Sequence, residues 1–169
     1  VVGSHNYVIK KDARFLINSG VASMGYGLPA AIGACIAHDK KTTVCLEGDG
    51  SIMMNLQELQ TVITNRLPIK LFLINNAGYH SIRQTQNNLF KDHSKVGIGP
   101  ESHDLSFPDF GKIAEAFGYR YYSAHSNKEM KEAVDKALEC EEPVFCEIFV
   151  STEQKFEPKS ETKKLEDGT

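Results

Sequence analysis

The sequence predicts an α/β fold with an open, mostly parallel sheet that carries helices on both faces. Two short apolar runs, at residues 43–46 and 69–74, are each followed within one residue by polar clusters, GDG at 48–50 and the pair Asn75 and Asn76. The 24 residues between these clusters contain one plausible helix. Because a strand–helix–strand unit places its strands side by side and parallel, both clusters should lie at the carboxyl edge of the sheet. Open α/β sheets bind their ligands at that edge.

The composition of the chain fits one domain followed by a tail. Of its 169 residues, 41% are hydrophobic, which is enough to bury a full core. We expect the domain over residues 1–150 and a C-terminal tail over residues 151–169, where the sequence becomes charged. The chain does not begin with Met, and together with its short tail this favours a piece cut from a longer polypeptide.

The overall charge and the cysteines argue against several classes of function. A net charge of −3 gives no reason to expect nucleic acid or an acidic membrane surface as a partner, and no apolar run approaches the length of a membrane span. The four cysteines show no metal-binding spacing. Cys45 and Cys146 lie in strand-like runs, where a buried reduced thiol is the better interpretation, and this predicts a cytoplasmic protein.

The elements around the central unit continue the alternation of helix and strand. The small-residue stretch at 19–34 should be a loop that leads into a helix ending near His38, with Pro29 in its first turn. A short helix should lie within residues 76–90, before a long polar loop or lid at 88–107. The remaining expected elements are a helix from Pro108 and Asp109 to Phe117 and strands at 119–123 and 143–150.

Two capping-box patterns predict helix starts. Asn55 with Glu58 starts a predicted helix that runs to Asn65, and Ser126 with Glu129 starts another. Glu58 is therefore interpreted as a helix cap and not as a catalytic acid. The apolar periodicity predicts the buried faces of both helices. These inward-facing residues are Leu56, Leu59, Val62 and Ile63 in the first, and Met130, Ala133, Val134, Ala137 and Leu138 in the second.

The polar clusters carry groups suited to a diphosphate and its cation. Mg²⁺ prefers about six oxygen ligands, of which protein side chains supply one or two. Asp49, expected at an exposed strand end, offers a carboxylate, and Asn76 offers an amide oxygen. Gly48 and Gly50 let the backbone approach phosphate, and Ser51 with the amides that follow can donate to phosphate oxygens. Two simple turns are the alternative, which either cluster alone would favour but the shared spacing behind two apolar runs disfavours.

The two clusters together resemble the diphosphate-binding signature of thiamine-diphosphate enzymes, in which GDG is followed at this distance by NN. The segment SG…MGYGLPAAIGA is similar to a second hallmark, that of acetolactate-synthase-like members. The resemblance spans nearly the whole chain. It implies the thiamine-diphosphate-binding fold, in the form of the diphosphate-binding C-terminal domain of such an enzyme, with thiamine diphosphate and Mg²⁺ as cofactors.

The resemblance also assigns residues to the cofactor. It implies Asp49, Asn76 and the backbone carbonyl of Gly78 as the ligands that the protein gives to Mg²⁺. The side chain of Met24 would lie beneath the bent cofactor, with the backbone of Ala22 and Met24 on its aminopyrimidine. The amides that follow the metal loop are expected to reach phosphate. The predicted cofactor-binding set is Ala22, Met24, Gly48, Asp49, Gly50, Ser51, Asn76, Gly78, Tyr79 and His80.

The implied activity is decarboxylation of a 2-oxo acid, alone or with carboligation to a second carbonyl compound, as in a lyase or transferase. In this family a Glu from a pyrimidine-binding domain activates the cofactor, and no segment here can supply that domain. We therefore expect a partner domain or subunit with that Glu, a homo-oligomeric parent enzyme, no catalytic residue in this chain and no turnover by the isolated chain. His80 and His93 are the candidate general acids or bases, because histidine is the side chain suited to proton transfer at physiological pH, but a lone histidine is more often a satisfied polar residue.

Some features leave the substrate open. Acetohydroxyacid synthases carry Trp nine residues after the metal-binding Asn, whereas this chain has Thr85 there and no Trp at all. Arg83 could face substrate or solvent. The alternatives are one subunit of a two-chain 2-oxo acid decarboxylase, similar to sulfopyruvate or phosphonopyruvate decarboxylase, and a non-catalytic diphosphate-binding module. Intact Asp49, Asn76 and Met24 argue against the non-catalytic module.

Overall fold

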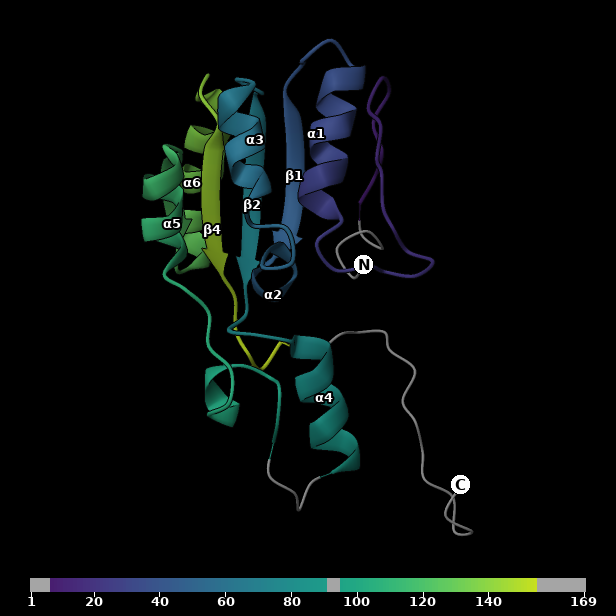
Figure 1. Ribbon diagram of the computed structural model, residues 1–169, viewed down its shortest axis with the longest axis vertical. Helices are drawn as coiled ribbons and strands as arrows, with labels where there is room; N and C mark the ends of the chain where they lie inside the picture. The colour runs from purple at the N-terminus through teal and green to yellow at the C-terminus, as the bar shows by residue number, and fades with distance from the viewer. Residues whose placement is uncertain (1–6, 91–94, 155–169) are drawn as a thin grey trace.

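The fold is built on one sheet of four strands. The computed structural model describes residues 7–90 and 95–154. Neighbouring strands all run parallel, in the order β1-β2-β4-β3, and Figure 1 shows the first three of them side by side. The strands are β1 (Thr43–Gly48), β2 (Ile69–Asn75), β3 (Arg120–Ala124) and β4 (Val144–Phe149). The predicted α/β class with an open parallel sheet is confirmed.

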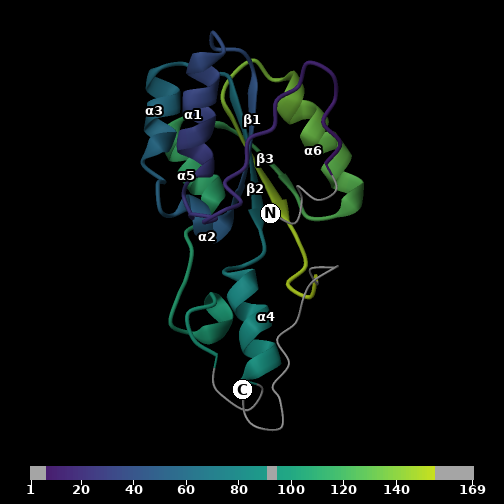
Figure 2. The ribbon, with the colours of Figure 1, turned by 90° about the vertical axis from the view of Figure 1, so that its right-hand side faces the viewer.

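Helices cover both faces of this sheet, as predicted. Three helices, α1 (Gly27–Ala37), α3 (Glu58–Thr64) and α5 (Phe110–Phe117), pack on one face. The helix α6 (Asn127–Glu139) packs on the other face, against β3 and β4 (Figure 2). The larger of the two apolar cores therefore lies under α1, α3 and α5.

Side chains of the central strands fill both cores. Leu71 of β2 is fully buried in the larger core. Cys45 and Cys146 are buried thiols, as predicted, and burial raises their pKa values to about 12 and about 11. Val44 and Leu46 of β1 lie on the opposite face of the sheet from Cys45, and α6 does not extend over β1. These two side chains are 51% and 61% exposed. The edge of the sheet at β1 is thus apolar on its open side.

The start of α6 confirms one of the two predicted caps. Ser126 Oγ accepts a hydrogen bond from the Glu129 N–H at 3.4 Å, while Glu129 Oε2 accepts one from the His125 N–H, one residue earlier than in a capping box. The predicted buried stripe is too wide, because Met130 and Leu138 are 41% and 48% exposed. Since α6 approaches the sheet through its buried alanines, the longer side chains lie at the margins of the contact.

The other predicted capping box is wrong. The N-cap position of α3 is Gln57, without a side-chain cap, and Glu58 Oε2 accepts from the Thr61 hydroxyl. The Asn55 side chain instead donates to the carbonyl of Gly25 at 2.8 Å, a tertiary partner that the local sequence does not reveal. The predicted inward face holds, with Leu59 and Val62 buried and Leu56 and Ile63 partly buried.

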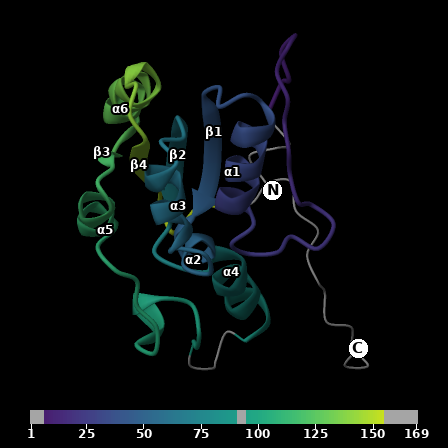
Figure 3. The ribbon, with the colours of Figure 1, turned by 45° about the horizontal axis from the view of Figure 1, so that its top comes forward.

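Short helices gather where the strands end. α2 (Asp49–Ile52) follows β1 directly, and α4 (His80–Leu89) follows β2 within the range predicted for a helix (Figure 3). The polar segment predicted as a loop or lid contains a 3-10 helix, η2 (Pro100–Ser102), and Ile98 within it is fully buried. Ile98 and Gly99 therefore pack against the domain, whereas Val96 in the same segment is 60% exposed.

Some predictions lie wholly or partly outside the described residues. These are His93 and the predicted tail from residue 155 onward. Within residues 7–90 and 95–154, none of the helices has the length and apolar character that crossing a membrane requires.

The larger core yields a stability prediction. Leu71→Ala should lower the free energy of unfolding by about 2–5 kcal/mol, because it leaves a cavity under α1 and α3. Leu138→Ala, the same change at a half-exposed position of α6, should change it by less than about 0.5 kcal/mol. Urea denaturation followed by circular dichroism measures both. Equal losses in the two variants would show that the core is not organised around β2.

Candidate functional site

The two sequence motifs meet at the carboxyl edge of the sheet. β1 and β2 are parallel neighbours, with Gly48 opposite Ile74, so the segments that follow them leave the sheet side by side. Asp49 Oδ2 accepts a hydrogen bond from the Gly78 N–H at 2.8 Å, and Oδ1 accepts one from the Gly50 N–H at 2.8 Å. The predicted approach of the GDG and NN segments is confirmed by this direct bond.

The carboxyl group of Asp49 is covered, contrary to the expectation of an exposed strand end. Only 2% of Asp49 is exposed, because the loop after β2 folds over it. The ring of Tyr79 lies against the neighbouring Gly50, since a Cβ at Gly50 would lie 2.3 Å from its Cε1 atom. Burial raises the pKa of Asp49, and the surrounding backbone N–H donors and the positive charge of Arg83 offset part of that rise.

Asn76, two residues before Gly78, carries an amide oxygen that lacks a partner. Asn76 Oδ1 is buried and accepts no hydrogen bond from any described residue. Such a group is costly to bury unless a ligand or water satisfies it. Each oxygen of Asp49 accepts one backbone hydrogen bond and keeps a lone pair. A carboxylate and an amide oxygen of this kind fit a hard cation such as Mg²⁺.

The two motifs supply little negative charge for a metal site whose ligands would all come from the protein. In the part of the chain that the structure describes, no group of three His, Cys, Asp or Glu side chains is placed to hold a metal ion. Asp49 is thus the one anionic side chain that the two motifs bring to the loop. A divalent cation here would need further negative oxygens, which a diphosphate supplies.

The loop that would hold the cation has a tightly set backbone. Gly78 has a φ of +130°, and a Cβ there would lie 2.1 Å from the Ile98 carbonyl oxygen. The Tyr79 N–H donates to that same carbonyl at 2.7 Å. The Tyr79 amide could therefore contact a phosphate only if this hydrogen bond opened. The assignment of Tyr79 to the cofactor remains a prediction.

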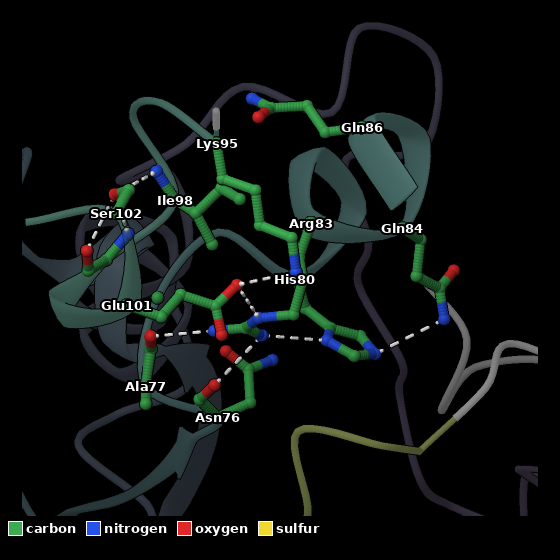
Figure 4. A network of polar contacts seen from close by, with 12 residues as sticks. Asn76, Ala77, His80, Arg83, Gln84, Gln86, Lys95, Ile98, Glu101 and Ser102 are labelled. Atoms are coloured by element: carbon green, nitrogen blue, oxygen red, sulfur yellow. Dashed lines mark hydrogen bonds and ion pairs between the residues drawn. The ribbon is translucent and has the colours of Figure 1, made fainter. Parts of the chain in front are cut away.

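His80 begins α4, and its ring is engaged in structure. Nδ1 lies 2.9 Å from Arg83 Nη1, and Nε2 lies 3.3 Å from Gln84 Nε2 (Figure 4). Nε2 also lies 2.5 Å from the Gln154 carbonyl oxygen. Because a guanidinium always donates, Nδ1 is the accepting nitrogen and Nε2 carries the proton that is donated to Gln154. This arrangement speaks against the ring as a general acid or base, while a phosphate contact by the His80 amide stays a prediction.

The segment that contains Ala22 and Met24, which is predicted to hold the aminopyrimidine end of the cofactor, is hydrogen-bonded to the GDG motif and the residues after it. The Gly25 N–H donates to Ser51 Oγ at 2.9 Å, and the Asn55 side chain donates to the Gly25 carbonyl at 2.8 Å. Ser51 still has its hydroxyl proton to give to a phosphate. Met24, next to this anchored residue, is 43% exposed at the carboxyl edge. The two motifs are thus joined directly by hydrogen bonds.

Two buried carboxylates near the site, Glu47 and Glu147, have partners that the sequence did not predict. Glu47 Oε2 accepts from the Leu28 N–H in the first turn of α1 at 3.1 Å. Glu147 of β4 accepts from the Asn75 side chain and from the Tyr121 hydroxyl, each at 2.6 Å. Their partners are far away in the sequence, so no local pattern signals either residue.

Asn75, the first Asn of the NN pair, sets the backbone conformation of the loop at residues 75–78, where the cation is predicted to bind. Asn75 Oδ1 accepts from the Ala77 N–H at 2.9 Å, while its amide nitrogen donates to Glu147. Ala77 has a φ of +55°, which side chains rarely adopt, and this bond holds the turn in that conformation. Asn75 therefore sets the backbone and leaves Asn76 to present its oxygen.

Comparison with known proteins identifies the class of this domain. The family model of the C-terminal TPP-binding domain of thiamine pyrophosphate enzymes matches residues 1–148. The chain belongs to this family, and membership implies thiamine diphosphate, another name for thiamine pyrophosphate, as its ligand. The fold and the paired motifs at one sheet edge agree with that assignment.

Individual relatives narrow the likeness to acetolactate synthases. The chain is 34% identical over 165 residues to the acetolactate synthase large subunit of Pyropia yezoensis, covering 93% of this chain and 27% of that protein. It is also 34% identical over 158 residues to the chloroplastic acetolactate synthase 1 of Zea mays, covering 88% of this chain and 25% of that protein. The chain thus spans about a quarter of the length of these curated relatives.

A solved structure supports the fold. The thiamine diphosphate-dependent 4-hydroxybenzoylformate decarboxylase of Rhodococcus jostii RHA1 superposes with a TM-score of 0.64 at 26% sequence identity. The match covers 76% of this chain and 23% of that chain.

The raised pKa of Asp49 predicts how stability depends on pH without cofactor. A carboxyl whose pKa is higher in the folded state stabilises the fold most below its unfolded pKa, and this contribution is lost as the pH rises through the folded pKa. The free energy of unfolding of the wild type should therefore fall relative to that of Asp49→Ala as the pH rises above about 4, the ordinary pKa of an aspartate. Urea denaturation of both proteins, without divalent metal, measures the difference. A difference that stays constant or grows with pH would contradict the burial of this carboxyl.

Proposed function

We propose that the chain is the diphosphate-binding part of an acetolactate synthase-like enzyme, which anchors thiamine diphosphate through Mg²⁺ for decarboxylation of a 2-oxo acid, with carboligation to a second carbonyl compound. One observation carries the proposal. The buried carboxylate of Asp49 is bonded to the Gly78 N–H, two residues after Asn76 and its unpartnered oxygen. These groups offer a cation the oxygens it prefers at the edge where such sheets bind ligands.

One group of residues is proposed to bind Mg²⁺ and the diphosphate, and a second group is proposed to bind the aminopyrimidine. Asp49, Asn76 and the carbonyl of Gly78 would hold Mg²⁺. The predicted diphosphate contacts are Gly48, Gly50, Ser51, Tyr79 and His80. Ala22 and Met24 would hold the aminopyrimidine end, at a segment that Ser51 and Asn55 fix to the GDG motif. When bound, thiamine diphosphate supplies a nucleophilic carbon that adds to the carbonyl of a 2-oxo acid and lets carbon dioxide leave.

The chain's own part in this chemistry is to bind and orient. The carboxylate of Glu47 accepts from the N-terminus of α1, and that of Glu58 accepts from Thr61, so neither serves as the activating acid. That acid is proposed to come from a pyrimidine-binding domain or subunit. Since the matched relatives are about four times as long as the region they share with this chain, they have room for such a domain.

One observation favours a second candidate. Thr85 stands where acetohydroxyacid synthases carry a Trp, and the chain has no Trp. A two-chain decarboxylase of 2-oxo acids, of the sulfopyruvate or phosphonopyruvate kind, would use the same cofactor site without that side chain. Both candidates require the same cofactor site, so they differ in the substrate and in whether the pyrimidine-binding domain belongs to the same polypeptide.

The metal assignment is tested by Asp49→Ala. Removing the one carboxylate of the loop should weaken Mg²⁺-dependent binding of thiamine diphosphate by at least about 100-fold, because even residues that only support a metal ligand contribute about 10- to 100-fold. Calorimetric titration of the full-length polypeptide measures this affinity. Asp135→Ala, which removes an exposed carboxylate on α6, is the matched control and should bind as the wild type does. Unchanged affinity in Asp49→Ala would refute the assignment.

The missing acid is tested by turnover. The isolated chain should release no carbon dioxide from pyruvate above background, since losing one oriented acid–base group costs about 10²–10⁴ in rate and an open cofactor also loses its water-excluded site. Carbon dioxide release is measured with and without a separately expressed pyrimidine-binding domain. Substantial turnover by the chain alone would show that the activating acid lies within these 169 residues.

A further inference from the structure

A buried arginine lies directly behind the metal loop. Arg83, in the first half of α4, is 4% exposed and points back towards the loop that leaves β2 (Figure 4). We infer that Arg83 is the positioning residue that fixes the backbone of the Mg²⁺-binding loop, with Glu101 as its counter-ion. This inference rests on the proposed function, because it concerns the same site.

The guanidinium of Arg83 donates hydrogen bonds to two successive peptide groups of the loop after β2. Arg83 Nη1 donates to the Asn76 carbonyl at 3.2 Å, and Nη2 donates to the Ala77 carbonyl at 2.9 Å. These carbonyls belong to the two peptide units between Asn76 and Gly78. Fixing both units fixes the direction of the Asn76 side chain and the place where Gly78 presents its own carbonyl. A rigid fork of donors can do this, whereas the single ammonium of a lysine cannot.

A second segment holds the arginine in place. Arg83 Nε lies 3.1 Å from Glu101 Oε1, within ion-pair distance but without hydrogen-bond geometry, so this contact is electrostatic. Lys95 Nζ lies 3.8 Å from the same oxygen. The segment that carries Glu101 also presses on the loop, because a Cβ at Gly99 would lie 2.4 Å from the Ala77 carbonyl oxygen. Arg83 thus joins the loop, α4 and the segment around η2.

Because Arg83 is buried, its hydrogen bonds to the Asn76 and Ala77 carbonyls should form together and restrict the loop to one conformation. A buried cation is tolerated only while it is paired and hydrogen-bonded, so a loop that changed shape would leave the guanidinium without its carbonyl partners. The loop is therefore expected to hold its geometry before any cation arrives. Mg²⁺ demands nearly ideal octahedral geometry, whereas Ca²⁺ accepts flexible arrangements, so a preset loop matters more for Mg²⁺.

Arg83→Lys tests the inference, because it keeps the charge and removes the fork. Hydrogen exchange of the cofactor-free full-length polypeptide should show lost protection at the Gly78 and Tyr79 amides, with β2 unchanged. Calorimetry with thiamine diphosphate should show affinity lowered by about 10- to 100-fold with Mg²⁺ and by less with Ca²⁺. The matched control is Arg120→Lys, the same change at an exposed arginine paired with Glu142.

The possible outcomes separate this inference from the proposed function. If Arg83→Lys matches Arg120→Lys in amide protection and in the ratio of Mg²⁺ to Ca²⁺ affinities, the inference is overturned. If Arg83→Lys does not fold, Glu101→Gln takes its place and should shift both measurements in the same direction; no shift overturns the inference. If the wild type binds no thiamine diphosphate with either metal, the proposed function fails, and the exchange comparison still decides the role of Arg83.

Discussion

The hydrogen bond between Asp49 and the Gly78 N–H is the contact on which the site depends. It exists because β1 and β2 pair in parallel with Gly48 opposite Ile74, so the segments leaving them meet at once. The bond turns a carboxylate that would face water into a buried group, and burial raises its pKa. A cation bound to this carboxylate and to the Asn76 oxygen would relieve the cost of burying both.

The rest of the edge is arranged to keep that contact in one geometry. Asn75, bonded to Glu147, holds the turn from the side of the sheet, and Arg83 holds it from the side of α4. The GDG side is held in turn by Ser51 and Asn55, which fasten it to the segment before α1. These supports come from different elements, so the loops at this edge are held by hydrogen bonds from several directions.

The sequence predicted the frame of this site because its signals are local. Two apolar runs and the distance between their polar ends were enough to place the GDG and NN segments together, and the bond between Asp49 and Gly78 confirms it. Predictions went wrong where a distant group competes. Asn55 bonds to Gly25 instead of capping α3, and the loop over Asp49 buries a carboxyl expected in water. Arg83, left open between substrate and solvent, is buried by partners that only the folded chain brings together.

The most direct test is a crystal structure of the full-length polypeptide with thiamine diphosphate and Mn²⁺, whose anomalous scattering locates the metal. The account predicts one anomalous peak bound by Asp49, by Asn76 Oδ1 and by the Gly78 carbonyl, at metal–oxygen distances of about 2.1 Å, with phosphate oxygens completing the shell. Cofactor density without a metal peak at these three groups, or a peak elsewhere in the domain, would contradict it.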